Sequence, residues 1–155
     1  MLFGVTGSGK TEIFLQVVEE TIKQGKEAII LVPEISLTPQ TIERFVGRFK
    51  HKIAIMHSRL TPKERFNQWR MIKNGEVKIA IGARSAIFAP FKNLGAIIID
   101  EEHDKSYISS QDPKYHTSDI ANFRANYQNA KLILASATPS INTMKDAMAV
   151  SYTHL

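Results

Sequence analysis

Short apolar runs alternate with longer amphipathic stretches along the chain. The runs are of strand length and rich in β-branched residues, and they cover 28–32, 53–56, 77–81, 96–99 and 131–135. Several are apolar at nearly every position, which is typical of strands that helices cover on both faces. A further short strand is expected at residues 1–3, ahead of the first amphipathic stretch.

The stretches between the runs carry the periodicity of amphipathic helices. They predict helices over 11–24, 39–50, 62–74 and 117–128. Gly25 and Gly75 stand where C-terminal caps are expected, and Thr61 with Glu64 three residues later predicts a capping box. The alternation of strands and helices predicts an α/β fold with a mostly parallel sheet and helices on both faces. In such a sheet, ligands bind beyond the carboxyl ends of the strands.

Composition narrows the class of protein only slightly. The chain has 155 residues, of which 43% are hydrophobic and 23% charged, as in an ordinary globular domain. It has no cysteine, which excludes disulfides and thiolate zinc sites and agrees with a reducing compartment. No export signal or membrane-length apolar run is visible, so a cytoplasmic location is expected. The net charge of +5 fits a polyanionic partner or simply a mildly cationic surface.

The sequence GVTGSGKT at 4–11 predicts a phosphate-binding loop. It matches the G-x-x-x-x-G-K-[ST] pattern and stands between a strand and a helix, as the pattern requires. Backbone N–H groups and the helix N-terminus would hold the phosphates of a nucleoside triphosphate, with Lys10 on the β- and γ-phosphates and the Thr11 hydroxyl on Mg²⁺. The residues expected to bind the nucleotide are Gly4, Thr6, Gly7, Ser8, Gly9, Lys10 and Thr11.

An acidic cluster follows the run at 96–99. Asp100 is expected to hold Mg²⁺ together with Thr11, and Glu101 to orient or deprotonate the attacking water, so that Lys10, Asp100 and Glu101 form the catalytic set. His103 is a candidate link to a neighbouring element. A zinc site is the weaker interpretation, because three carboxylates and one histidine suit a harder cation.

A third motif, Ser-Ala-Thr-Pro, follows the last run. The hydroxyls of Ser136 and Thr138 are expected to hydrogen-bond His103 or a nearby carboxylate and so to relay the nucleotide state. Taken alone, Thr138 before Pro139 would be no more than a helix start. The order of the three motifs favours the coupling role.

These motifs, in this order, resemble the first motor lobe of superfamily 2 helicases. Within it, the blocks LVPEISLTPQ (31–40), IGARSAIFAPF (81–91), DEEHD (100–104) and PKYH (113–116) are similar to the PriA family of primosomal replication-restart helicases. The likeness runs from Phe3 to about Met148. It implies a RecA-like ATP-binding lobe over 1–149. Because the first strand begins at Met1 and has barely three residues, where five or six are usual, we expect it to be cut short. The tail at 150–155 departs from the family pattern and is expected to be non-native.

The resemblance also implies DNA contacts. Thr38, Gln40, Arg84 and Ser85 carry donors suited to the phosphates of single-stranded DNA, and Arg59 would add a further contact. The alternative role for Arg84 is a structural ion pair with an acid.

Tyr107 and Tyr115 lie in a segment that resembles the aromatic-rich loop by which such helicases couple DNA to ATP hydrolysis. Tyr107 is expected to stack on bases, unless both tyrosines only cover the edge of the core. Trp69 is expected to pack in the core.

The function implied by the resemblance is that of a DNA helicase which moves 3′-to-5′, acts at stalled forks and restarts replication by primosome assembly. Its implied partners are forked or single-stranded DNA, primosome and single-strand-binding proteins, and a second lobe of the same protein. Zinc would sit in a cysteine-rich module outside this chain. Because the second lobe supplies an arginine finger worth ~10³–10⁵ in rate, this chain should bind Mg·ATP and hydrolyse it poorly.

Two other functions stay open at the level of sequence. The first is a self-contained P-loop enzyme of another class, such as a small-molecule kinase, which would need a substrate pocket or lid. The second is a non-catalytic interaction module with a vestigial P-loop. The intact set of Lys10, Thr11, Asp100 and Glu101 argues against such decay.

Overall fold

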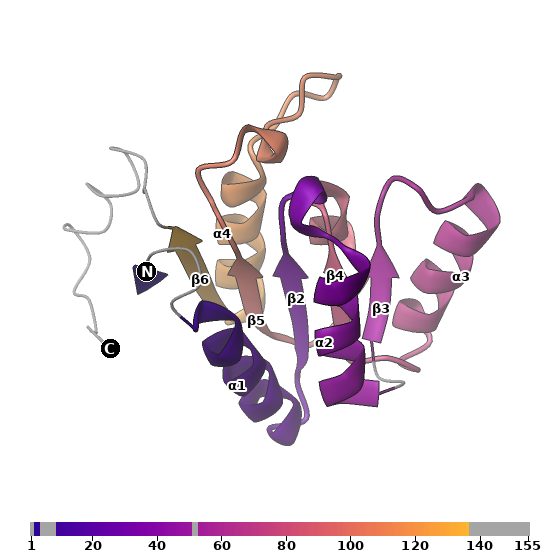
Figure 1. Ribbon diagram of the computed structural model, residues 1–155, viewed down its shortest axis with the longest axis vertical. Helices are drawn as coiled ribbons and strands as arrows, with labels where there is room; N and C mark the ends of the chain where they lie inside the picture. Colours follow the sequence, from indigo (N-terminus) through magenta and orange to yellow (C-terminus); the bar gives the residue numbers. More distant parts are fainter. Residues whose placement is uncertain (1, 4–8, 51–52, 137–155) are drawn as a thin grey trace.

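Within the residues that the computed structural model describes, which are 2–3, 9–50 and 53–136, the chain forms one parallel sheet (Figure 1). The strand order is β1-β6-β5-β2-β4-β3, and every neighbouring pair is parallel. The strands are β1 (Leu2–Phe3), β2 (Glu27–Leu31), β3 (Ile53–Met56), β4 (Ile79–Gly82), β5 (Leu94–Ile99) and β6 (Lys131–Ser136).

Four α-helices connect these strands in the described part of the chain. They are α1 (Lys10–Lys23), α2 (Pro39–Phe49), α3 (Pro62–Lys73) and α4 (Thr117–Gln128). Short 3₁₀ helices follow three of the strands: η1 (Glu34–Ser36), η3 (Arg84–Phe88) and η4 (Lys105–Tyr107). Each strand and α-helix predicted from periodicity is confirmed, with bounds that differ by at most two residues.

The sheet separates two hydrophobic cores, and the side chains of each central strand alternate between them. Ala28 and Ile30 of β2 pack with α1 and α2, whereas Ile29 and Leu31 pack with α3 and α4. Figure 1 shows α1 and α2 in front of the sheet and α4 behind it. This three-layer α/β arrangement explains why the strands are apolar at nearly every position.

The predicted helix boundaries have the expected local causes. Thr61 and Glu64 form a complete capping box at the start of α3. Gly25 and Gly75 follow α1 and α3 with φ of 74° and 73°, a conformation that glycine adopts without steric cost. None of the described helices is long and apolar enough to cross a membrane.

Candidate nucleotide and nucleic-acid site

The carboxyl edge of the sheet divides into two halves. The P-loop sequence, the acidic cluster and the Ser-Ala-Thr motif follow β1, β5 and β6, which are neighbours in the sheet. The segments with Thr38, Gln40, Arg59, Arg84 and Ser85, expected to contact DNA phosphates, follow β2, β3 and β4, which form the other half. Tyr107, which was expected to contact bases, follows β5 instead.

Helix α1 begins where a phosphate would bind. Gly9 precedes it with φ of 81°, Lys10 is its first residue, and no side chain caps its N-terminus within the described residues. The other three α-helices are capped by Thr38, Thr61 and His116. The Glu12 amide donates to the Gly9 carbonyl at 3.0 Å, and phosphate binding at this N-terminus, which the motif implies, stays a prediction. Gly4, Thr6, Gly7 and Ser8 lie outside the described residues.

Asp100 lies half-buried at the end of β5, and its amide donates to the Leu31 carbonyl at 2.9 Å. Burial raises the pKa of the Asp100 carboxyl, while the Glu101 amide and then the positive charge of Lys10 act against that shift. The charge of Lys10 is thus near enough to favour the ionised form of Asp100, whereas a shared role of the two residues at one site stays a prediction.

Glu101 has a backbone conformation that is rare for a residue with a side chain. Its φ is 48°, in the left-handed region, and its amide donates to Asp100 Oδ1 at 3.0 Å. Non-glycine residues persist in this region where the surrounding structure holds them, often at functional sites. The roles expected of Asp100 and Glu101 stay predictions.

The third motif contacts the second as the sequence predicted. His103 Nδ1 lies 2.7 Å from Ser136 Oγ, and the Glu102 amide donates to the Ala135 carbonyl at 3.0 Å. Ser136 is buried, so this hydrogen bond joins the ends of β5 and β6 in a partly protected setting. Thr138 lies outside the described residues, and the coupling role of all three residues stays a prediction.

The donors expected to meet DNA are largely exposed on the other half of the edge. Gln40, Arg59 and Ser85 are exposed. Thr38 is exposed too, but its hydroxyl accepts from the Thr41 amide at 3.2 Å and so caps α2. Its structural role is therefore shown, whereas contact of these residues with DNA stays a prediction.

One contact within this half was missed from the sequence. The Ser58 hydroxyl donates to the Glu34 carboxylate, and the Ser58 amide donates to the same oxygen at 3.3 Å. These hydrogen bonds join the loop after β3, which also carries Arg59, to η1 after β2. No local pattern signals it, because the partners are 24 residues apart.

Arg84 is held by the segment that follows the acidic cluster. Its guanidinium donates to the carbonyl of Ile108 at 2.6 Å and more weakly to that of Ser106 at 3.4 Å. It also lies 5.8 Å from the ring centre of Tyr115. Its partners are thus carbonyls and an aromatic ring, and the guanidinium has further N–H donors for a phosphate.

The prediction that Tyr107 stacks on bases is wrong for this conformation. The side chain is 0% exposed and belongs to the core beside α4. Its hydroxyl donates to the Asp100 carbonyl at 2.7 Å, and its own carbonyl accepts from Thr117 Oγ1 at 2.7 Å. Although the sequence around Tyr107 is polar, its side chain is buried and joins the loop to the end of β5.

The prediction that Trp69 packs in the core is also wrong. Its side chain is 37% exposed, and Phe66 beside it is 59% exposed. The two rings stack with centres 6.5 Å apart, and Lys73 Nζ lies 4.7 Å from the Trp69 ring. Helix α3 covers edge strand β3, so one side of it faces solvent, and its core contacts come from buried Ile72 and partly buried Met71.

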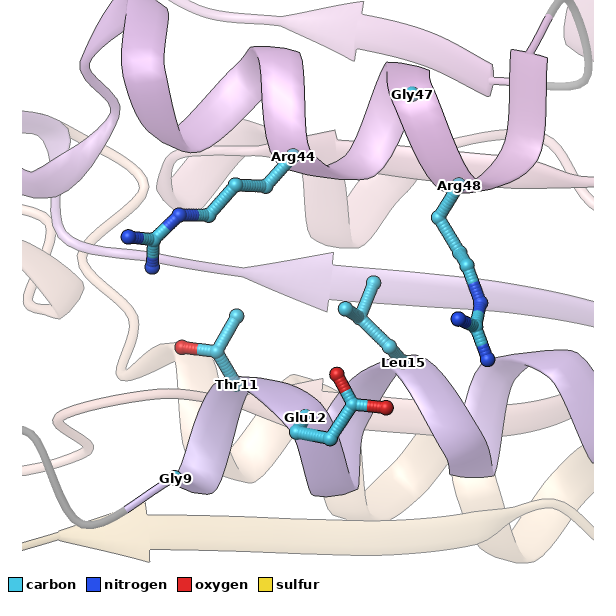
Figure 2. A pocket seen from close by; sticks show the side chains of 7 residues that line it. All are labelled: Gly9, Thr11, Glu12, Leu15, Arg44, Gly47 and Arg48. Carbon is cyan, nitrogen blue, oxygen red and sulfur yellow. The ribbon is translucent and has the colours of Figure 1, made fainter.

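A cavity of about 580 Å³ lies between α1 and α2, next to the start of α1 (Figure 2). Sequence reasoning missed it, because it depends on how the two helices lie across the sheet. The only local signal is a glycine inside an amphipathic helix, with an arginine on either side. Its lining consists of Gly9, Thr11, Glu12, Leu15, Arg44, Gly47 and Arg48.

Two oxygen-bearing side chains, at the start of α1 and at the end of β5, fit a nucleotide with bound magnesium. Thr11 offers a hydroxyl and Asp100 a half-buried carboxylate, the hard oxygen ligands that Mg²⁺ prefers when substrate phosphates and water complete its shell. No cluster of three or more histidine, aspartate or glutamate side chains suited to holding a metal occurs among the described residues. A magnesium ion here would therefore rely on the nucleotide for most of its ligands.

Comparison with known proteins agrees with this arrangement. The DEAD/DEAH box helicase family profile matches residues 1–147. The chain is 53% identical to replication restart protein PriA of Bacillus subtilis over 98% of its length, and 48% identical to that of Haemophilus influenzae over its full length. It spans about a fifth of the length of these curated relatives, 19% and 21% respectively.

Solved structures show the same fold. RecG bound to a three-way DNA junction superposes with a TM-score of 0.62 at 26% identity, covering 89% of this chain and 18% of RecG. A hypothetical ATP-dependent RNA helicase from Sulfolobus tokodaii gives a TM-score of 0.63 at 20% identity, covering 94% of this chain and 43% of that one. With a RecA-like sheet that gathers the three motifs at one edge, the chain belongs to the DEAD/DEAH box helicase family.

Proposed function

We propose that the chain is the ATP-binding first motor lobe of a DNA helicase. The observation that carries this proposal is the sorting of motifs along one sheet edge, with nucleotide motifs on the β1-β6-β5 half and DNA candidates on the β2-β4-β3 half. A motor needs both ligands on one rigid element, close enough for each to affect the other. The membership of the helicase family and the similarity to PriA support the same function.

On the nucleotide half, each residue has a chemical role. The N-terminal amides of α1 and the Lys10 ammonium would hold the triphosphate, and Thr11 with Asp100 would hold Mg²⁺, which neutralises phosphate charge when bound. Glu101 would orient or deprotonate the attacking water. The His103–Ser136 hydrogen bond would keep the ends of β5 and β6 in register around that chemistry.

On the other half, exposed donors would follow the backbone of single-stranded DNA. Arg59, Arg84 and Ser85 offer phosphate contacts that read no sequence, as expected of a motor that must move over any sequence. Gln40 and Thr38 lie at the start of α2 and would add side-chain contacts there.

A short chain of contacts joins the two halves. Arg84 donates to the Ile108 carbonyl at 2.6 Å. Tyr107, which precedes Ile108 in the sequence, donates to the Asp100 carbonyl at 2.7 Å. A DNA phosphate that binds Arg84 would weaken the hydrogen bond between Arg84 and this loop. The change would be passed through Tyr107 to the end of β5, which carries Asp100. In this proposal Tyr107 couples DNA occupancy to nucleotide chemistry by packing and hydrogen bonding, without touching DNA.

The wider role follows from the relatives, of which the chain is about a fifth. We infer a role in replication restart, with 3′-to-5′ unwinding at stalled forks and with primosome and single-strand-binding proteins as partners. A second lobe would supply the arginine finger, worth ~10³–10⁵ in rate. This chain alone would therefore bind Mg·ATP and turn it over very slowly.

Separate binding measurements test the division of the sheet edge. Lys10→Ala should abolish calorimetric binding of Mg·ATP and leave the affinity for fluorescent oligo(dT) unchanged. Arg59→Ala with Arg84→Ala should weaken oligo(dT) binding about tenfold, flatten its salt dependence and leave Mg·ATP binding intact.

The matched control removes two positive charges elsewhere. Arg70 and Lys73 lie in the last turn of α3, away from the carboxyl edge, and their replacement by alanine should change neither affinity more than about twofold. Equal loss of oligo(dT) binding in this control would show that only net charge matters. Mg·ATP binding with no affinity for oligo(dT) would instead favour a self-contained P-loop enzyme.

A further inference from the structure

The outer face of helix α3 leaves an aromatic surface exposed to solvent. Phe66 is 59% exposed and Trp69 is 37% exposed, and their rings stack with centres 6.5 Å apart. Lys73 Nζ lies 4.7 Å from the ring centre of Trp69 and extends the same face by one turn. The core contacts of the helix come from Met71 and Ile72, on its other side. Figure 1 shows α3 at the end of the sheet, beside β3. Exposed aromatic side chains that gather in this way mark interaction sites more often than scattered ones do.

Positive charge surrounds this aromatic surface. Helix α3 has a net charge of +3, because it carries one acid, Glu64, and the four cations Lys63, Arg65, Arg70 and Lys73. The Glu64 carboxylate is engaged at the start of the helix, where it accepts from the Thr61 amide and hydroxyl at 2.8 Å each. Lys63, Arg65 and Arg70 are exposed and form no ion pair or side-chain hydrogen bond with any described residue. Lys63 and Arg70 stand three residues before and four after Phe66, so they flank the rings on one face.

A contact with the edge strand holds α3 in place. Gln68 Oε1 accepts from the Ile55 amide of β3 at 3.0 Å. A strand at the edge of a sheet has amides without a partner strand, and an unpaired edge invites a further strand to pair with it. Because Gln68 already accepts from this donor, the edge of β3 is less open to such pairing. A partner at this end of the molecule therefore meets the outer face of α3 before it meets the strand.

We propose that the outer face of α3 docks an acidic amphipathic helix of a second protein. In that arrangement an apolar stripe of the partner lies on Phe66 and Trp69, while glutamate and aspartate side chains beside the stripe meet Lys63 and Arg70. The aromatic rings and Arg70 supply contacts of the kinds that carry most of the binding energy at interfaces. The cations select an acidic partner and speed its association.

DNA suits this surface less well. A duplex offers phosphates to a convex helix face and keeps its bases stacked, so the aromatic rings would find no apolar partner. The residues expected to contact single-stranded DNA lie at the carboxyl edge of the sheet, whereas the last turn of α3, with Arg70 and Lys73, lies away from it. The surface also lies at the opposite edge of the sheet from β1 and β6, the first and last described strands, which leaves it open to a second protein.

Trp69 is the only tryptophan of the chain, so its fluorescence reports on this surface alone. The probe is a synthetic helical peptide with leucine at positions i, i+3, i+4 and i+7 and glutamate on either side of that stripe; its counterpart has lysine in place of glutamate. The acidic peptide should shift the Trp69 emission to shorter wavelength and reduce its quenching by acrylamide, with half-saturation on the order of 10–100 μM. The lysine peptide, oligo(dT) and a DNA duplex should leave the emission unchanged. Raising the salt from ~50 to ~500 mM should weaken binding of the acidic peptide several-fold.

Substitutions separate the aromatic and the charged parts of the surface. Phe66→Ala, and the pair Lys63→Ala with Arg70→Ala, should each weaken binding of the acidic peptide about tenfold. Phe123→Ala is the matched control, because Phe123 is 69% exposed but lies on α4, and its replacement should change the affinity by less than about twofold. Thermal melting of each variant checks that it is folded.

The absence of any Trp69 response to the acidic peptide would overturn the inference. An equal response to the lysine peptide, a response to DNA, or an equal loss in Phe123→Ala would do so as well. Fluorescein-labelled acidic peptide should also bind the chain extended to the length of its curated relatives, with an affinity within about twofold of that for the present chain. Loss of binding there would place a segment of the protein itself on α3 and overturn the assignment to a second protein.

Discussion

Arg124 of α4 should contribute strongly to stability, because it ties that helix to the segment after β4. Its guanidinium donates to the carbonyls of Ile87 and Ala89, the second at 2.9 Å, and more weakly to that of Phe91 at 3.4 Å. The side chain is half-buried, and burial lowers the pKa of the Arg124 guanidinium. This segment includes η3, which carries Arg84 and Ser85.

Arg124→Ala removes two good hydrogen bonds and one weak one and leaves their carbonyls without these donors. At about 0.5–1.5 kcal/mol for each of the two good bonds, the free energy of unfolding should fall by about 1–3 kcal/mol. For a chain of this length that corresponds to a melting temperature lower by roughly 2–12 °C. Arg124→Lys should recover part of the loss, because an ammonium can reach only some of the carbonyls.

Chemical denaturation followed by circular dichroism measures this difference. Arg65→Ala is the matched control, because Arg65 is exposed on α3 and its loss should stay within about 0.5 kcal/mol. The reasoning is refuted if Arg124→Ala unfolds with the same midpoint as Arg65→Ala. Oligo(dT) affinity of the folded variant should also fall, since η3 loses its support.

Three further substitutions test other contacts. Gly82→Ala should cost about 1–3 kcal/mol in denaturant titrations, because its Cβ would lie 2.1 Å from the Met56 carbonyl oxygen; an unchanged midpoint would contradict that close approach. Tyr107→Phe should cost about 1 kcal/mol by losing the bond to the Asp100 carbonyl, and equal stability would show that the bond contributes nothing. Burial raises the pKa of Asp100, so without Mg²⁺ the folded state favours the protonated carboxyl and loses stability as pH rises through that pKa. Asp100→Asn should therefore melt above the parent chain at neutral pH, with a gap that closes below the unfolded pKa of about 3.9, whereas a gap constant with pH would contradict the assignment.

Local sequence patterns were sufficient to predict the strands and helices. The strands follow from apolar runs, and α3 follows from Thr61, Glu64 and Gly75, because capping and periodicity depend on neighbours a few residues apart. The common edge of the motifs after β1, β5 and β6 was also predictable, since parallel strands bring their carboxyl ends to one edge of a sheet. The resemblance to helicases then led to the function that we propose for that edge.

The aromatic residues were misplaced because their burial depends on distant partners. Tyr107 lies in a polar segment, yet contacts with Asp100 and Thr117 draw it into the core. Trp69 lies on an amphipathic helix, yet that helix covers only the edge strand of the sheet. Neither fact is encoded within a window of a few residues. The cavity beside Arg44 has the same origin in the packing of two helices.

The most direct test of the central claim is ATP turnover with and without single-stranded DNA, in the chain extended to the length of its curated relatives. The account predicts that DNA stimulates ATP turnover by the extended chain. Glu101→Gln should abolish this turnover while ATP binding persists, and the present chain alone should show almost none. Turnover that is equal with and without DNA, or that the present chain sustains by itself, would contradict a motor lobe whose two sheet halves act together.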